Sequence, residues 1–239
     1  MSKGIFITGT GTDVGKTYVT ALIVKKLHEA GINAGYYKAA VSGNDYGTDG
    51  KLVPGDAAYV KKVSGISQNV SEMCPYVYEH AYSPHLASRL EGNPVKLERV
   101  MQGYGEVSNE YDYVTMEGSG GILCPVDFDT KELWLWEIIK KLGLPCVIVA
   151  DAGLGTINSV GLTVWFMRDK GIPVSGIIFN HFHPGNVMED DNLIMCEHIT
   201  GVKVIAKVED GSEDIDMDVD GLKKLYKDIT LSKSQEIRE

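Results

Sequence analysis

The chain has 239 residues, of which 44% are hydrophobic and 23% are charged, as in ordinary globular domains. This composition excludes a disordered, collagen-like or disulfide-dense chain, and the length is typical of a single α/β domain. Because 33 acidic residues outnumber 23 basic residues and leave a net charge of −10, we expect neither nucleic acid nor an anionic membrane as a partner.

Stretches with the pattern of buried strands alternate along the chain with stretches that have the helical period. Strands are predicted at 4–8, 34–38, 113–116, 145–150, 174–179 and 202–208. Helices are predicted at about 15–30, from 56, from 84, after 94, and at about 131–142, 156–169, 190–199 and 222–226. The glycine-rich, polar segment 42–55 is typical of a mobile loop. This alternation predicts one α/β domain over 1–228, with a mostly parallel sheet and helices on both faces, and a flexible tail at 229–239.

The sharpest motif lies between the first predicted strand and the first helix, where residues 9–17 are GTGTDVGKT. Glycines allow backbone N–H groups to converge on phosphate oxygens, and the positive end of the following helix adds to the attraction. In such a loop Lys16 reaches the β- and γ-phosphates of a nucleotide, and the Thr17 hydroxyl binds Mg²⁺. Thr10 stands where the first glycine is usual, so this is a variant phosphate-binding loop. The expected fold is therefore P-loop NTPase-like.

Polar residues also follow most of the other predicted strands. These residues are Lys38, Ser42, Glu117, Asp151 and Asn180. Ligands of open parallel sheets bind at the carboxyl ends of the strands, so we expect these side chains to serve one site. Glu117 is the first candidate for the acid that holds Mg²⁺, because a glycine-rich turn at 118–121 follows it, and Asp151 is the second.

Each of these residues also has a simpler interpretation. Lys38 could cap a strand at the surface, Glu117 could be a solvated turn acid, and Asp56 could only cap the helix that it opens. His181 and His183 are interpreted as loop residues rather than as a metal pair, because no third ligand accompanies them.

The sequence contains no recognisable targeting segment. Its N-terminal apolar run is too short for a signal peptide, and no run approaches the ~20 apolar residues of a membrane helix. The four cysteines have no CxxC spacing, which argues against zinc or thioredoxin-type chemistry, and free thiols suit a reducing compartment. We therefore expect a cytoplasmic protein. The acidic run at 209–220 is interpreted as a solvated loop.

Together, these motifs resemble those of the dethiobiotin synthetase family of biotin biosynthesis. The resemblance covers roughly residues 4–180, with the matching segments in family order. They are GTxTxxGKT at 9–17, GYxK at 35–38 with Ser42-Gly43, Asp56, Ser83-Pro84-His85, EGxGG at 117–121, LGxIN at 154–158 and Asn180. The segment 206–210 departs from the proline-bearing nucleobase loop of the family, so no residue is assigned there.

The resemblance implies a ligase that uses ATP, Mg²⁺ and CO2 to close a ureido ring on 7,8-diaminopelargonic acid. One amine of the substrate would form a carbamate, ATP would activate it as a carbamic–phosphoric anhydride, and the second amine would close the ring. Lys16 and Lys38 would then be the catalytic cations, and Thr17, Asp56 and Glu117 would hold Mg²⁺.

The same resemblance implies which residues bind the two substrates. The ATP-binding set is Asp13, Val14, Gly15, Lys16, Thr17, Tyr18, Asp56, Glu117, Gly118, Ser119, Gly120 and Asn180. The set that binds diaminopelargonate is Thr12, Ser42, Gly155, Thr156 and Asn158. It also implies a homodimer, in which the helix start after Gly155 grips the distal carboxylate of the substrate in the neighbour's site.

Two other enzyme classes of the same superfamily are alternatives. A regulatory ATPase of the ParA/MinD class would carry a second lysine five residues before Lys16, where this chain has Gly11. An amidotransferase-type synthetase of cobalamin assembly would add a glutaminase domain, for which 239 residues leave no room.

Overall fold

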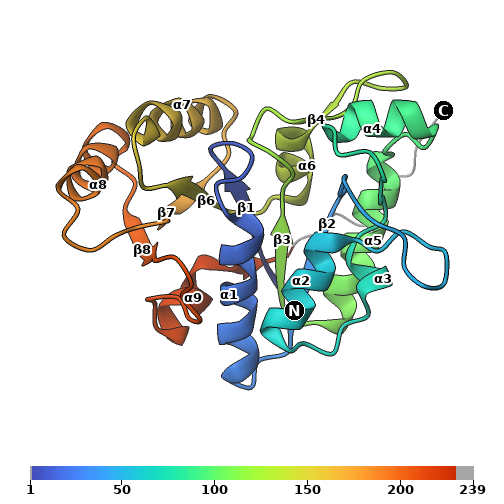
Figure 1. Cartoon of the computed structure of the whole chain (residues 1–239), viewed down its shortest axis with the longest axis horizontal. Helices are drawn as coiled ribbons and strands as arrows, with labels where there is room; N and C mark the ends of the chain where they lie inside the picture. Colours follow the sequence, from blue (N-terminus) through green and yellow to red (C-terminus); the bar gives the residue numbers. More distant parts are fainter. Residues whose placement is uncertain (1, 230–239) are drawn as a thin grey trace.

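A computed structural model of the chain describes residues 2–229, and a seven-stranded sheet lies at its centre (Figure 1). Six strands are parallel, in the order β2-β3-β1-β6-β7-β8, and β9 pairs antiparallel with β1. They are β1 (Lys3–Gly9), β2 (Ala34–Lys38), β3 (Tyr113–Glu117), β6 (Cys146–Asp151), β7 (Val174–Asn180), β8 (Val204–Val208) and β9 (Lys227–Asp228). The predicted mostly parallel sheet is confirmed.

Helices cover both faces of the sheet. Successive strand residues point to opposite faces, and both faces carry apolar side chains that the helices bury. On β1, Phe6 packs into one apolar core, while Ile5 and Ile7 pack into the other, and all three are fully buried. The core around Phe6 includes helices α5 (Leu97–Glu110), α6 (Leu135–Leu142), α7 (Thr156–Asp169) and α8 (Val187–Thr200). The core around Ile5 includes α1 (Lys16–Glu29), α2 (Gly55–Ser64) and α9 (Val219–Leu225).

Four short elements, including β9, escaped the sequence prediction, and one helix begins later than expected. The helix expected from about 131 begins at Leu135, because β4 (Pro125–Asp127) and β5 (Leu133–Trp134) first form an antiparallel hairpin. The Trp134 N–H donates to Glu137 Oε2 at 2.9 Å and so marks the true start of α6. A single-turn helix, α3 (Val70–Met73), also went unpredicted, whereas α4 (Pro84–Glu91) starts where Pro84 indicated.

The last part of the chain packs against α1 before the described region ends. In the acidic run 209–220 most side chains are exposed, but Ile215 is buried and Lys26 Nζ lies 2.8 Å from Asp214 Oδ2. The predicted tail lies outside the described residues apart from its first residue, Ile229. Within 2–229, no helix has the length and apolar character needed to cross a membrane.

The parallel register brings the ends of three neighbouring strands close together. Lys38, the last residue of β2, is paired with Glu117, the last residue of β3, and Glu117 is paired with Ile7 of β1. The loop that follows β1 therefore begins beside Glu117. Helix α2 packs beside α1 and places Asp56, in its first turn, at the same edge of the sheet.

Candidate active site

The backbone of the loop between β1 and α1 requires glycine at position 15. Gly15 has a φ angle of 85°, and a Cβ atom at this position would lie 2.0 Å from Asn180 Nδ2. The left-handed backbone and the close side chain both require glycine. Asn180 Nδ2 also donates to the Val14 carbonyl at 3.2 Å, which ties the loop to the end of β7.

The loop offers a set of converging donors to an anion. Between residues 2 and 229, nothing accepts a hydrogen bond from the backbone N–H groups of 11–15, and the first N–H groups of α1 point the same way. Lys16 folds over the loop, and its Nζ donates to the Gly11 carbonyl at 2.7 Å. Burial, and then the charge of Lys38, lower the pKa of Lys16. Free N–H groups, a helix start and an ammonium group together form a phosphate site.

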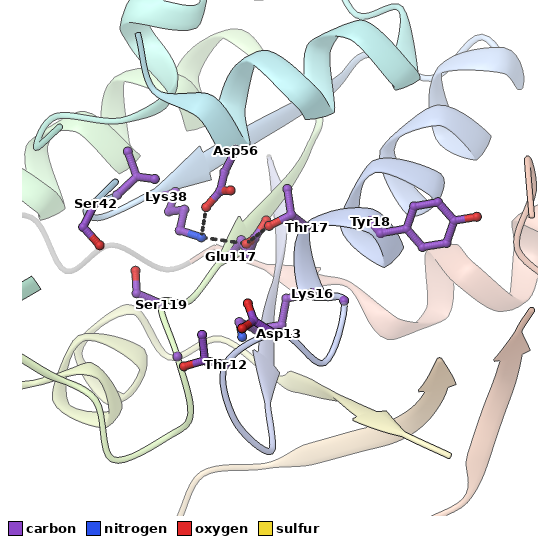
Figure 2. Close-up of a pocket in the computed structure, with 13 residues that line it drawn as sticks. Thr12, Asp13, Lys16, Thr17, Tyr18, Lys38, Ser42, Asp56, Glu117 and Ser119 are labelled. Atoms are coloured by element: carbon purple, nitrogen blue, oxygen red, sulfur yellow. Dashed lines mark hydrogen bonds and ion pairs between the residues drawn. The ribbon is translucent and has the colours of Figure 1, made fainter. Parts of the chain in front are cut away.

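A cluster of a buried lysine, a buried glutamate and a half-buried aspartate lies beside the loop (Figure 2). Lys38 Nζ lies 2.6 Å from Asp56 Oδ2 and 2.7 Å from Glu117 Oε1. Lys38 is 4% exposed and Glu117 is 1% exposed, so neither is the surface residue of the simpler interpretation. Burial lowers the pKa of Lys38, but Glu117 and Asp56 outweigh that effect and leave the pKa above its ordinary value. These contacts therefore favour the charged form of Lys38.

Glu117 is held by hydroxyl groups on two sides. Thr17 Oγ1 donates to Glu117 Oε1 at 2.8 Å, and Tyr36 Oη donates to Glu117 Oε2 at 3.0 Å. Burial, and then the charge of Glu117, raise the pKa of Tyr36 well above its ordinary value, so its hydroxyl stays protonated. Sequence reasoning missed Tyr36, although strand periodicity could have found it, because residues 36 and 38 point to the same face of β2.

These groups face a cavity of about 460 Å³, within the range of small-molecule sites. Its wall is formed by Thr12, Asp13, Gly15, Lys16, Thr17, Tyr18, Lys38, Val41, Ser42, Asp56, Glu117, Ser119 and Gly120. The structure therefore brings together most of the residues predicted from the sequence. Val41 is the one lining residue that was not predicted.

The oxygen atoms that face the cavity are suitable ligands for a magnesium ion. The Thr17 hydroxyl and the carboxylates of Asp56 and Glu117 are ligands of the kind that Mg²⁺ prefers. The ammonium group of Lys38 lies against both carboxylates, which shows that the pair attracts a cation. In the described range, no three His, Cys, Asp or Glu side chains converge, so water and phosphate oxygens would complete the shell, as is usual for Mg²⁺.

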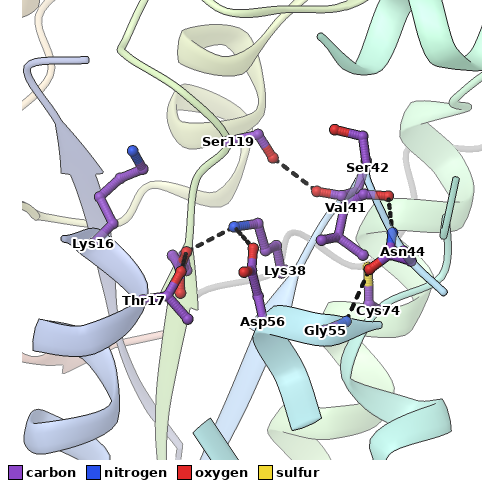
Figure 3. A network of polar contacts seen from close by, with 12 residues as sticks. Lys16, Thr17, Lys38, Val41, Ser42, Asn44, Gly55, Asp56, Cys74 and Ser119 are labelled. Atoms are coloured by element: carbon purple, nitrogen blue, oxygen red, sulfur yellow. Dashed lines mark hydrogen bonds and ion pairs between the residues drawn. The ribbon is translucent and has the colours of Figure 1, made fainter. Parts of the chain in front are cut away.

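A second polar network holds the chain segment that follows β2 (Figure 3). Asn44 Oδ1 accepts from the Gly55 N–H at 2.9 Å, and Asn44 Nδ2 donates to the Tyr78 carbonyl at 2.7 Å. Ser119 Oγ donates to the Ala40 carbonyl at 2.7 Å. Asn44 therefore fixes the start of α2, and with it Asp56. Nothing in the sequence marked Asn44, because it lies in a loop without a motif.

Three of the predicted ATP-binding residues, Val14, Gly118 and Asn180, are not part of the cavity wall. Gly118 is packed against Phe6, and Val14 is held by Asn180. The Asn180 side chain is itself buried, and its Oδ1 atom has no hydrogen-bond partner among residues 2–229. This atom is therefore an unused hydrogen-bond acceptor at the end of β7.

Asp151, the second candidate for a metal ligand, is used elsewhere. Its Oδ2 lies 2.8 Å from His181 Nδ1, and its Oδ1 accepts from the Gly153 N–H at 2.7 Å. His183 Nδ1 lies 3.0 Å from Glu189 Oε1. Both histidines also face Asp210, with Nε2 to carboxylate distances of 3.9 Å for His181 and 3.7 Å for His183, but no metal-binding group of three such side chains forms in the described residues. The geometry therefore favours Glu117 over Asp151 as the acid beside the phosphate loop.

The remaining predicted substrate residues lie apart from this cavity. Gly155, Thr156 and Asn158 form the start of α7 and are absent from the cavity wall. Gly155 and Asn158 are exposed, and Gly155 has a φ angle of 93°. The first turn of α7 contains no acidic residue, so its N–H groups can attract an anion.

Comparisons with known proteins agree with this geometry. The family model described as "AAA domain" matches residues 3–213. An ATP-dependent dethiobiotin synthetase BioD of Brachyspira hyodysenteriae is 50% identical over 212 residues, which are 88% of this chain and 94% of the relative. One of Clostridium botulinum is 43% identical over 226 residues, 95% of this chain and 99% of the relative.

Solved structures show where this fold occurs more widely. The MinC:MinD cell division complex of Aquifex aeolicus matches with a TM-score of 0.54 over 89% of this chain and 83% of the other. The two sequences are only 14% identical, so the likeness extends to the fold alone. The ParA/MinD alternative therefore gains no functional support from it.

Proposed function

This chain belongs to the dethiobiotin synthetase family, and from that premise we propose how its residues divide the work of an ATP-dependent cyclo-ligase. The enzyme consumes ATP and CO2 to convert 7,8-diaminopelargonic acid into dethiobiotin, a step of biotin biosynthesis. One observation carries the assignment of roles: Lys16, Lys38 and the oxygen ligands of a metal line one cavity. Such a site needs no nucleophilic side chain, because the substrate supplies both amines.

The reaction begins at the amine of the substrate that takes up CO2. The nitrogen attacks CO2 and loses a proton, which leaves a carbamate anion. We assign the stabilisation of this anion to Lys38, whose contacts favour its charged form and which lies at the end of β2 beside the phosphate loop. Ser42 and Thr12 line the same cavity, and we assign to them the orientation of the amines.

The phosphate loop then serves the transfer of the γ-phosphoryl group. A carbamate oxygen attacks the γ-phosphorus and the bond to ADP breaks. The N–H groups of 11–15 and the Lys16 ammonium offset the negative charge that develops on the phosphate oxygens. A Mg²⁺ ion held by Thr17, Asp56 and Glu117 would supply further charge neutralisation at those oxygens. The second amine finally attacks the activated carbonyl carbon, expels phosphate, loses a proton and closes the ring.

We assign recognition of the nucleobase to Asn180. Its buried Oδ1 atom has no partner among the described residues, while its Nδ2 atom is engaged by the Val14 carbonyl. The amide therefore offers an acceptor and matches the exocyclic amino group of adenine. Asp13, Tyr18, Ser119 and Gly120 line the path to the triphosphate.

We also propose that two copies of the chain form the working enzyme. The start of α7 carries the predicted carboxylate site but lies outside the cavity wall of its own chain. Large apolar side chains are exposed on and around α7 and α8, including Leu154 at 92%, Trp165 at 55% and Ile194 at 62% exposure. Exposed apolar surface of this kind is typical of an interface, so a partner subunit would cover it and receive the α7 helix start.

The compartment follows from the cysteines. All four are free, and Cys74, Cys146 and Cys196 are buried. Free thiols suit a reducing environment. We therefore propose that the enzyme acts in the cytoplasm. Measuring enzyme activity in cell fractions would test this.

A product assay tests the proposed function. Purified protein is mixed with diaminopelargonate, MgATP and bicarbonate labelled with ¹³C, and dethiobiotin is measured by mass spectrometry. We expect dethiobiotin that carries the label in its ureido carbon, with one ADP and one phosphate formed for each molecule.

The Lys16→Ala variant should form no labelled product, whereas Lys62→Ala is the matched control. Lys62 is an exposed lysine of α2 outside the cavity wall, and its loss should leave the yield unchanged. ADP formation without labelled dethiobiotin in the wild-type protein would contradict the proposed function.

A further inference from the structure

The two carboxylate oxygens of Glu117 have different surroundings. Oε1 faces the cavity, where Thr17 Oγ1 lies at 2.8 Å and Lys38 Nζ at 2.7 Å. Oε2 faces the interior, where it accepts the hydroxyl of Tyr36 at 3.0 Å. Only one oxygen of this acid is therefore directed at the place where a metal would bind.

Tyr36 is held firmly where it can keep Oε2 in this position. Its side chain is fully buried, and β2 lies at the edge of the sheet. Gln68 closes that edge, because its Oε1 accepts from the Tyr36 N–H at 2.8 Å and its Nε2 donates to the Tyr36 carbonyl at 3.0 Å. Gln68 is 1% exposed. The backbone of Tyr36 is thus fixed by a side chain that acts as a missing neighbour strand.

We propose that Tyr36 is a positioning residue that restricts Glu117 to one coordinating oxygen and thereby favours Mg²⁺ over Ca²⁺. Mg²⁺ requires a nearly ideal octahedron of single oxygens, whereas Ca²⁺ accepts more ligands and often binds both oxygens of a carboxylate. Rotation of the Glu117 carboxylate to present both oxygens would take Oε2 away from Tyr36. The buried hydroxyl would then lose its partner, which is unfavourable. The inference rests on the proposed metal ligands.

The adjacent residue provides a matched control. Tyr37 is also fully buried, but it points to the opposite face of β2, and its hydroxyl donates to the Val100 carbonyl at 2.9 Å. Tyr36→Phe and Tyr37→Phe each remove one buried hydroxyl from neighbouring positions of one strand. Only the first removes a contact with a proposed metal ligand.

The experiment measures metal binding without turnover. Mn²⁺ bound to the protein with a non-hydrolysable ATP analogue is followed by electron paramagnetic resonance, and Mg²⁺ or Ca²⁺ is added until half of the Mn²⁺ is displaced. We expect the ratio of the Ca²⁺ midpoint to the Mg²⁺ midpoint to fall by about tenfold in Tyr36→Phe, the usual scale for loss of a contact to a metal ligand. The ratio should stay at the wild-type value in Tyr37→Phe. Affinity of the nucleotide itself for the two metals cancels in the comparison.

Two further variants make every result decisive. Tyr36→4-aminophenylalanine restores an N–H donor at the same place and should restore the ratio, including in a case where the Phe variant folds poorly. An unchanged ratio in a folded Tyr36→Phe variant, or failure of the amino variant to restore it, would overturn the inference. Glu117→Gln should weaken Mn²⁺ binding, and if it does not, the proposed metal site itself is wrong.

Discussion

Lys38 and Glu117 end two neighbouring parallel strands in register, and their side chains meet at 2.7 Å between Nζ and Oε1. Such a pair of buried charges is weak evidence for a role in stability, because desolvation offsets much of the attraction. It has a clearer meaning for function. The lysine offsets part of the negative charge of Glu117 and Asp56, and we propose that a metal bound by these carboxylates would make its ammonium group available to the carbamate.

Replacing Lys38 by methionine should separate these two roles. Turnover should fall by more than tenfold, which corresponds to about 1.4 kcal/mol or more in the barrier, whereas binding of the nucleotide should be nearly unchanged. The variant leaves two carboxylates without their cation, so the metal-free protein should lose on the order of 3 kcal/mol of unfolding free energy. Mg²⁺ should restore most of that loss.

Steady-state kinetics and thermal melting with and without Mg²⁺ measure these effects. A Lys38→Met variant that kept more than about a tenth of the wild-type kcat would mean that Lys38 is not a catalytic cation. A melting temperature that does not respond more strongly to Mg²⁺ than that of the wild type would mean that Lys38 does not stand in for the metal.

The second prediction concerns the lysine of the phosphate loop. Lys16→Ala removes the only ammonium group that lies over the loop in the described part of the chain, with its Nζ on the Gly11 carbonyl. MgATP binding should weaken by at least tenfold, and turnover should become undetectable. Isothermal titration calorimetry with a non-hydrolysable analogue measures the binding, and Lys62→Ala serves as the control. Unchanged affinity in Lys16→Ala would refute the phosphate-loop assignment.

The central features of the fold could be predicted because they depend on local pattern. The strand that ends at Lys38 and the helix that starts at Thr156 were predicted at the observed bounds, since burial periodicity and glycine signals act over a few residues. The hairpin of β4 and β5 was missed, because strands of two and three residues are too short to show an alternating pattern. The alternating residues before Leu135 fit the start of a helix equally well.

Prediction of the site had a different limit. Residues next to glycine-rich turns, such as Lys16 and Glu117, could be identified because the motif itself carries the chemistry. Gln68 and Asn44 could not, because each acts through a contact with a residue far away in the sequence. Register and packing decide such contacts, and no single segment encodes them.

The third prediction concerns pH. Hydrogen bonding to Glu189, followed by the charge of Glu189, raises the pKa of His183 above its ordinary value, and Asp210 and Glu209 add to the effect. A raised pKa in the folded state means that this pair stabilises the protein fully below the unfolded pKa and loses its effect as pH rises through the folded pKa. The melting temperature of His183→Gln should therefore lie below that of the wild type at about pH 6 and equal it at about pH 9.

Differential scanning calorimetry at several pH values measures this difference. His28→Gln is the control, because His28 is exposed and makes no ion pair with another residue of the described range. A difference between wild type and His183→Gln that persists unchanged at the alkaline end would show that the ring acts by packing and not by charge.

The last prediction concerns the shared site of the proposed dimer. Lys38 lies in the cavity, whereas Asn158 lies on the exposed start of α7, so the two residues would serve one reaction from different subunits. Lys38→Ala and Asn158→Ala should each inactivate the homodimer. In a mixed dimer one site carries both defects and the other carries neither. Random exchange makes about half of the dimers mixed, so about a quarter of the wild-type activity should return.

The experiment requires proof of exchange and a matched pair that cannot complement. Tags on the two variants allow mixed dimers to be isolated, and their activity is compared with that of each variant alone. Lys38→Ala mixed with Lys16→Ala is the control, because both residues line the cavity of one chain. In that mixed dimer each site keeps one defect, so no activity should return. If the Asn158 mixture behaves in the same way although its mixed dimers are verified, each site is built from a single chain, and the α7 helix start does not serve the neighbouring subunit.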